Sequence, residues 1–278
     1  MSVPSTAKVH YGPSAMGGEW RRFVNLTWTL ATTDFKLRYF GSALGYVWSL
    51  MQPLMLFGAM YVVFTQFFSF GQGVPHYPVY LLTSIMLWTF FVETTTGCVQ
   101  CLLAREGLLR KMRFPRMVIP LSMALMSMFN LGMNMIAVFV FATASGVYPR
   151  LTWLEMPLLV VLLAMLALGV GMILSVLYVR FRDILPIWSV FTQMLFYGSP
   201  IIYVASKYKS YIRPALSNPI AAILTQMHHA FIDPNAHGAA RSIGGSVRLL
   251  IPFGIIAFAF AFGLWFFNRE APRIAENL

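Results

Sequence analysis

The chain carries no charged side chain between Arg38 and Glu93, a stretch of 54 mostly apolar residues. Over the whole chain only 10% of the residues are charged and 58% are hydrophobic, whereas soluble domains average about 25% charged residues. Helices satisfy their own backbone polar groups in lipid, and the apolar stretches lack the alternation that barrel strands require. The sequence therefore predicts an all-α membrane protein.

Six apolar segments are long enough to cross a bilayer core, which takes about 20 residues for each helix. The predicted spans are residues 44–64, 77–101, 117–147, 154–179, 184–203 and 249–267. Residues 1–18 are polar and lack the apolar core of a signal peptide, so we expect a flexible cytoplasmic tail. Residues 19–278 are predicted to form one membrane domain.

The basic residues are divided unevenly between the two sides that this topology defines. Six crossings place both termini on one side, which collects 14 of the 20 Lys and Arg residues. Because cytoplasmic loops carry the excess of basic residues, both termini are predicted to be cytoplasmic. The net charge of +11 favours contact with anionic lipid or an acidic protein surface, and not with nucleic acid.

Residues 19–38 have the pattern of an amphipathic helix at the membrane interface. Aromatic and small residues share one helical face, and basic residues lie elsewhere. The helix either orients the first span or helps to admit a lipid-linked substrate, and the pattern leaves both interpretations open. The basic residues that would meet a lipid headgroup are Arg21, Arg22, Lys36 and Arg38.

Gln52 and Pro53 interrupt the first span near its middle. Proline removes a backbone donor and bends a helix, and the freed carbonyl and the Gln52 amide need protein or water around them. We therefore expect this side of the first span to face away from lipid.

The second span contains two features that invite a functional interpretation. Glu93 is a charge inside an apolar helix, where it is costly and usually functional or paired; the sequence identifies neither its partner nor its role. Cys98 and Cys101 have a C-x-x-C spacing. Inside an apolar span they are interpreted as small packing residues, and not as metal or redox ligands.

Four motifs follow one another along the chain. They are RYFGSALGYVWSLMQPLMLFGAMYVVF in the first span, LLRKMRFPRMVIPL at 108–121, YVRFRDILPIWSVFTQMLFYGSPIIY at 178–203 and SNPIAAILTQMHHAFI at 217–232. Together they resemble the ABC-2 type transporter permeases, in the subgroup that exports O-antigens, teichoic acids and related polymers. The resemblance covers roughly residues 30–268.

The resemblance implies a half-transporter that forms a homodimer and works with two copies of a separate ATPase. The chain has no G-x-x-x-x-G-K-[ST] phosphate-binding loop, so ATP and magnesium are expected in the partner and no cofactor or metal in this chain. We expect a transport protein and not an enzyme. The implied substrate is a polyprenyl-linked polysaccharide or related polymer, moved across the bacterial inner membrane.

The loop at 104–116 is short, basic and interleaved with apolar residues. A loop that only fixes topology would explain the charges, whereas the resemblance implies a cytoplasmic coupling helix that docks on the ATPase. The pair before the fifth span is a second candidate contact, or simply an ion pair at a helix end. The implied coupling residues are Arg105, Leu108, Arg110, Lys111, Arg113, Phe114, Arg182 and Asp183.

Spans one and five are rich in aromatic residues, and the resemblance implies that they line a polymer channel. Aromatic rings pack against sugar rings, but aromatic residues also favour both bilayer interfaces, so both explanations stay open. The candidate lining residues are Tyr46, Trp48, Gln52, Phe57, Tyr61, Trp188, Phe191, Phe196, Tyr197 and Tyr203.

The segment before the last span is predicted to hold short re-entrant exit helices. Asn218 or Ser217 can cap a helix that has Pro219 in its first turn, and this helix is too short to cross. An ABC-2 exporter of small drugs or lipids would share the fold and is the alternative function. A secondary carrier or a membrane scaffold is disfavoured, because no duplicated halves with charged midplane residues are found.

Overall fold

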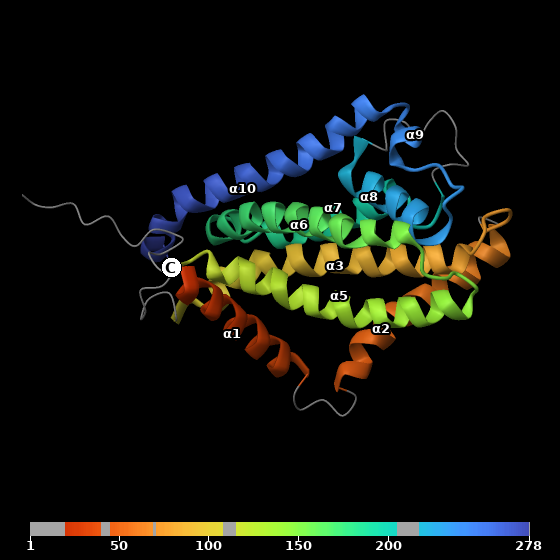
Figure 1. Ribbon diagram of the computed structural model, residues 1–278. Helices are drawn as coiled ribbons and strands as arrows, with labels where there is room; N and C mark the ends of the chain where they lie inside the picture. Colours follow the sequence, from red (N-terminus) through yellow and green to blue (C-terminus); the bar gives the residue numbers. More distant parts are fainter. Residues whose placement is uncertain (1–19, 40–44, 69–70, 108–114, 205–216, 278) are drawn as a thin grey trace, which may run out of the picture.

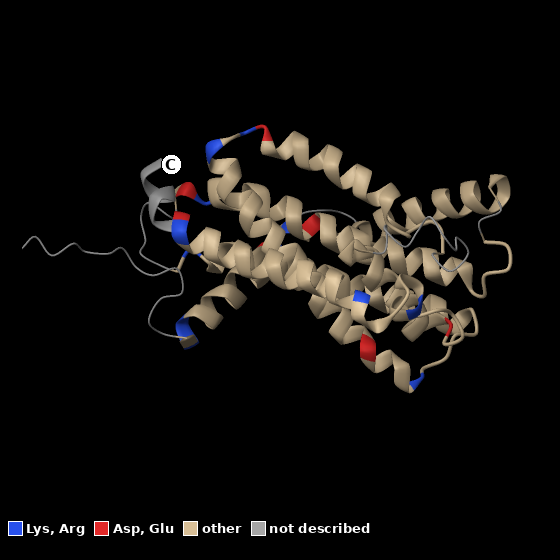
Figure 2. Cartoon of the chain, turned by 90° about the horizontal axis from the view of Figure 1, so that it is seen from above, with Lys and Arg blue, Asp and Glu red and all other residues tan. Residues whose placement is uncertain are grey.

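The computed structural model describes residues 20–39, 45–68, 71–107, 115–204 and 217–277, and within these ranges the regular structure is helical, with no strand. The long helices run side by side in one bundle, with α3 in its middle (Figure 1). We call the end where α10 finishes the terminal end, and the other the opposite end. Charged residues gather toward the two ends, with few between them (Figure 2).

Five helices in the described ranges are long and apolar enough to cross a membrane. The first predicted span forms α2 (Gly45–Val62), which continues as the π-helical turn η1 (Val63–Phe67). The predicted segments at 77–101, 117–147 and 154–179 lie within a few residues of the observed helices, and the last helix continues beyond residue 267. These four helices are α3 (Tyr77–Ala104), α5 (Val118–Ala144), α6 (Glu155–Arg180) and α10 (Leu250–Asn277).

The predicted span at 184–203 is helical only in its first part. α7 (Ile184–Gly198) has 15 residues, about 22 Å of helix. It stops before Pro200, and residues 201–204 are non-helical and largely buried. Their backbone is held by α3, since the Tyr77 hydroxyl donates to the Ile202 carbonyl oxygen at 2.7 Å. Length and composition therefore support five crossings in the described residues.

Glycines set the closest helix contacts in the bundle. A Cβ atom on Gly169 of α6 would lie 2.6 Å from the carbonyl oxygen of Ala259 in α10, so the two backbones touch. A Cβ atom on Gly171 would lie 2.8 Å from Cβ of Cys98 in α3. Cys98 and Cys101 are both buried free cysteines, and the described residues form no group that could hold a metal ion. Their interpretation as small packing residues agrees with these contacts.

The segment before the last span folds into short helices at the opposite end (Figure 1). Asn218 begins α8 (Pro219–Met227), and its side-chain oxygen accepts from the Ile220 backbone N–H at 3.0 Å, which confirms the predicted cap. α8 is buried on nearly all sides against α6 and α10. The remaining short elements are η2 (Leu151–Leu154), η5 (His228–Ile232), α9 (Ala239–Ile243) and η6 (Ser246–Leu249).

The first helix, α1 (Trp20–Tyr39), matches the predicted helix at 19–38 within one residue. Phe23, Thr27 and Ala31 form its buried face, and it packs mainly on α5. In Figure 1 it starts at the terminal end and slants away from the axis of the bundle. The residues at its two ends therefore meet different parts of the protein.

Candidate functional site

A polar cavity of about 610 Å³ lies where α1, α2, α3 and α5 meet. Such a cavity is notable in a chain this apolar, because polar groups at membrane depth need protein or water as partners. Its lining residues are Arg38, Tyr39, Trp48, Ser49, Gln52, Pro53, Leu56, Trp88, Thr89, Val92, Glu93, Thr96, Asn130 and Asn134.

Glu93 of α3 is the centre of the hydrogen-bond network in this cavity. It forms an ion pair with the Arg38 guanidinium, and the Asn130 amide of α5 donates to the same carboxylate oxygen at 2.6 Å. The Tyr39 hydroxyl donates to the Asn130 side-chain oxygen at 2.7 Å. Burial raises the pKa of the Tyr39 phenol above its ordinary value. Glu93 thus has the polar partner that the sequence left unidentified.

The network lies well inside the bundle. Glu93 is eleven residues before the end of α3, roughly 16 Å along the helix axis. Because Arg38 reaches it, the C-terminal end of α1 lies deeper than an interface helix at the end of the bundle would. A partly buried ion pair loses some of its hydration, so further hydrogen bonds must satisfy its atoms, and Asn130 supplies one of them.

One group in the cavity is accessible to a ligand, and a second lacks a hydrogen-bond partner among the described residues. The Arg38 side chain remains 47% exposed, against 18% for Glu93. The Asn134 side-chain oxygen is buried and accepts no hydrogen bond from the described residues, although native structures rarely leave such an atom without a partner. The cavity therefore offers a partly exposed cation and also contains a buried amide oxygen without a partner in the described residues.

The side of α2 that was predicted to avoid lipid borders this cavity. Trp48 and Gln52 are exposed and line it, and Pro53 is buried in its wall. Phe57 stacks on Tyr61, with 5.8 Å between ring centroids, and meets Phe141 of α5 edge-on. The Tyr46 side chain lies outside the described residues.

The predicted channel residues of α7 lie on two different faces. Trp188 is buried, and its indole N–H donates to the Thr95 hydroxyl of α3 at 3.1 Å. Phe196 is half-buried against Trp88, while Phe191 and Tyr197 are exposed. Tyr203, past the end of α7, is half-buried, and its carbonyl oxygen accepts from the Tyr80 hydroxyl at 3.1 Å.

The predicted coupling residues are described only in part. The Arg105 guanidinium pairs with Asp34 of α1 and donates to the Ser122 hydroxyl of α5 at 3.3 Å, so it ties three elements together. Arg182 is exposed and lies over the Tyr178 ring at 5.3 Å. Asp183 precedes α7, but its side chain caps no backbone N–H. The other coupling candidates, Leu108, Arg110, Lys111, Arg113 and Phe114, lie outside the described residues.

The four basic residues predicted to admit a lipid headgroup do not form one site. Arg21, Arg22, Lys36 and Arg38 are all exposed on α1. Arg22 and Arg38 are sixteen positions apart, which is about 24 Å along a helix. One headgroup cannot contact both ends, and of these four residues only Arg38 lines the polar cavity.

Sequence reasoning missed the contribution of α5 to the site. Asn130 and Asn134 are buried and lie one helical turn apart. Two amides at this spacing within an apolar helix are themselves a signal, because polar side chains inside a span usually hydrogen-bond across helices. Glu93 was recognised as unusual, but its pairing with Arg38 joins residues 55 positions apart.

Comparison with known proteins identifies the family. The family model for ABC-2 type transporters matches residues 25–232, which is most of the chain. The chain is 29% identical over 251 residues to an O-antigen export system permease protein, RfbA, of Klebsiella pneumoniae, covering 90% of this chain and 93% of that protein. It is 25% identical over 238 residues to the RfbA permease of Myxococcus xanthus, covering 84% and 91%. The chain belongs to the ABC-2 type transporter family and is a membrane transport protein, not an enzyme.

Proposed function

We propose that this ABC-2 type transporter is the permease subunit of an exporter that moves a polyprenyl-linked polysaccharide, of the O-antigen kind, across the bacterial inner membrane. Membership of the family implies an ATPase partner, and the similar permeases of Klebsiella and Myxococcus carry names that refer to O-antigen export. The observation that carries the proposal is the polar cavity beside the exposed face of α2, which places a partly exposed cation inside the bundle.

In the proposed topology the chain crosses the membrane six times, with both termini in the cytoplasm. α7 supplies the fifth crossing together with the buried residues 199–204 that follow it, since α7 alone is shorter than a bilayer core. The terminal end of the bundle is then cytoplasmic. α8, η5 and α9 re-enter at the outer side without crossing.

The polymer channel forms between two copies of the chain, along α2 and α7. Both helices carry exposed apolar faces, with Met51 and Met55 on α2 and Val190 and Met194 on α7, and a second copy would cover part of them. Trp48, Gln52, Phe191 and Tyr197 face the channel from one copy or the other. Trp188 supports the channel wall from behind, because it is buried against α3.

The charged end of the lipid carrier enters at the polar cavity. Arg38 contacts the diphosphate, since guanidinium groups bind phosphate oxygens through paired charge-assisted hydrogen bonds. Glu93 and Asn130 hold Arg38 in position until the carrier arrives. Lys36 lies two residues before Arg38, on the other side of α1, and so faces away from the cavity.

The coupling segment acts on the cavity through α1. Asp34 pairs with Arg105, and Arg38 pairs with Glu93. Residues four apart share one face of a helix, so a single face of α1 connects the end of α3 to the cavity. Docking of residues 104–116 on the ATPase, with Arg182 and Asp183 as a second contact, moves this face when ATP closes the partner subunits.

The proposal is tested by removing the chain from cells and locating the lipid-linked glycan. We expect undecorated cells in which the glycan accumulates on the inner leaflet, and co-purification of the chain with an ATPase. An unchanged glycan distribution, with accumulation of a small drug or a lipid instead, would favour the alternative exporter and reject the polymer. Failure to recover any ATPase with the chain would reject both.

A further inference from the structure

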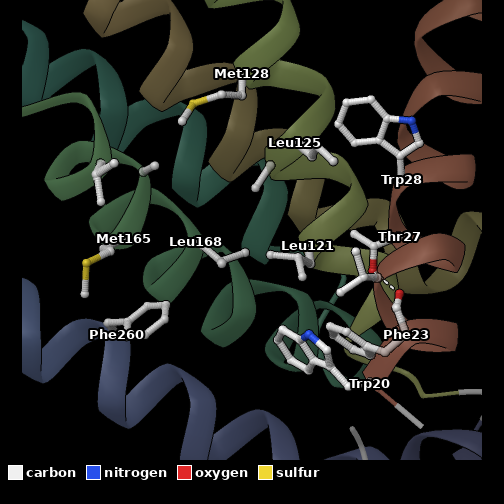
Figure 3. A pocket seen from close by; sticks show the side chains of 14 residues that line it. Trp20, Phe23, Thr27, Trp28, Leu121, Leu125, Met128, Met165, Leu168 and Phe260 are labelled. Carbon is white, nitrogen blue, oxygen red and sulfur yellow. Dashed lines mark hydrogen bonds between the residues drawn. The ribbon is translucent and has the colours of Figure 1, made fainter. Parts of the chain in front are cut away.

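An apolar groove of about 400 Å³ lies along the N-terminal half of α1, whereas the polar cavity lies at the C-terminal end of this helix, and the two share no lining residue. Its walls come from α1, α5, α6 and α10. Figure 3 shows Trp20 and Trp28 of α1 on one side, Leu121, Leu125 and Met128 of α5 behind them, and Met165, Leu168 and Phe260 across the gap. The groove is large enough to be a ligand site, which typically measures about 300–1,000 Å³.

The lining offers almost no polar contact inside the groove. Thr27 is the one hydroxyl in its wall, and this hydroxyl already donates to the Phe23 carbonyl oxygen at 2.8 Å. Phe23 closes one end, where it packs with Met172 of α6 and Phe267 of α10. An occupant of the groove must therefore be a flexible apolar chain, and not a sugar or a peptide.

The residues at the edge of the groove are exposed, and two residues next to them are basic. Trp20 is 73% exposed and Trp28 is 55% exposed, and indole rings prefer the headgroup level of a membrane. Arg21 and Arg22 follow Trp20, are exposed, and form no ion pair with the described residues. An apolar groove bordered by exposed indoles, with basic residues next to Trp20, is complementary to a lipid with an anionic headgroup.

We propose that this groove is a binding site for an anionic phospholipid of the inner leaflet, with one acyl chain between α1, α5, α6 and α10 and the phosphate beside Arg21 and Arg22. The site is independent of the exported substrate, whose proposed entry lies about 24 Å away along α1 at Arg38. Because the walls come from α1 and from the α6–α10 pair, the lipid fills the space between them and supports the position of α1.

The test uses the full-length chain reconstituted in phosphatidylcholine vesicles that contain phosphatidylglycerol spin-labelled on its acyl chain. We expect a motionally restricted lipid component in the wild type. Ala164→Phe, which fills the groove, should remove this component, and Leu125→Phe is a second filling variant if the first does not fold. Ala257→Phe is the matched control, because Ala257 is exposed on α10 outside the groove, and it should retain the component.

The headgroup is tested by the double variant R21Q/R22Q. We expect the preference for phosphatidylglycerol over phosphatidylcholine to fall about 25-fold, since each of the two basic residues near the surface contributes roughly fivefold. Arg269→Gln removes a basic residue that lies over Trp265 and should leave the preference unchanged.

Three results would overturn the proposal. One is a restricted component that survives both filling variants. Another is preferential retention of a polyprenyl phosphate over phosphatidylglycerol by the purified chain. A third is efficient cross-linking between two copies through V161C, because Val161 lines the groove and is 47% exposed; a second copy, and not lipid, would then fill it.

Discussion

The polar cavity and the apolar groove both border α1 and α5 but differ in the ligand that each can hold. The cavity contains an ion pair, two amides and an exposed face of α2, whereas the groove is lined by aliphatic and aromatic side chains, and the exposed Arg21 and Arg22 follow its lining residue Trp20. α1 produces both because its first turns carry Trp20 and Phe23 and its last turn carries Arg38. One helix can thus present separate sites to two lipids.

The largest expected effect is the loss of polymer export when the Arg38 side chain is replaced. Arg38→Gln should lower polymer export by about 10- to 100-fold, because a hydrogen bond to a charged group contributes about 1.5–3 kcal/mol. Export is measured as glycan appearing at the cell surface, normalised to folded protein. Arg269→Gln should export normally, and an Arg38→Gln variant that also exports normally would remove Arg38 from the carrier site.

The next effect tests the contact between α6 and α10, two of the helices that form the walls of the groove. Gly263→Leu should force α10 away from α6, since a Cβ atom at Gly263 would overlap the Gly169 backbone, at a cost of about 1–3 kcal/mol for overpacking. Thermal unfolding in detergent measures this change in free energy. Gly254→Leu is the control on the same helix, because a Cβ atom there meets nothing within 4 Å. Equal destabilisation by the two variants would contradict the contact.

A smaller effect separates the two faces of α7. Trp188→Phe removes the hydrogen bond to Thr95 and should lower the free energy of unfolding by about 1 kcal/mol, with export per folded molecule preserved. Tyr197→Ala changes an exposed residue. We expect this variant to keep the free energy of unfolding of the wild type and to export less polymer per folded molecule. If Trp188→Phe instead abolished export without changing stability, the assignment of Trp188 to the wall would be wrong.

The smallest effect lies at the opposite end of the bundle, away from both sites. Burial lowers the pKa of His228 to about 4; the nearby His229 adds to this shift, and the Asp233 carboxylate opposes it. The His228 side chain therefore becomes protonated near pH 6.5 in the unfolded chain, but stays neutral in the folded protein until the pH approaches 4. The free energy of unfolding falls as the pH drops from 6.5 toward 4. Between pH 8 and pH 6 the expected loss is about 0.8 kcal/mol. The variant H228Q should abolish this dependence, while a matched change at the exposed His237 should retain it.

Hydropathy and capping were enough to predict most of the fold. The charge-free run after Arg38, the long apolar segments and the Asn218 cap each follow from local chemistry. The length of α7 could not be predicted in this way. Residues 199–204 are as apolar as a membrane helix, but their backbone is not helical. Hydropathy does not distinguish an apolar helix from a buried extended segment.

The site was predictable only in its individual parts. Gln52, Glu93 and Arg38 each stood out as polar or charged residues in or beside apolar segments. Their meeting in one cavity depends on the slant of α1, which is set by the packing of Phe23, Thr27 and Ala31 on its neighbours. The apolar groove left no comparable signal, because its lining residues look like any other membrane-facing positions.

The double variant R38Q/E93Q tests most directly whether Arg38 receives the carrier or only neutralises Glu93. Export is measured beside both single variants in cells that lack the native chain. If Arg38 binds the diphosphate, the double variant stays as inactive as Arg38→Gln, because removing Glu93 does not restore a phosphate ligand. If Arg38 is only a counter-ion, the neutral Gln–Gln pair restores export toward the wild-type level, and the carrier must enter elsewhere.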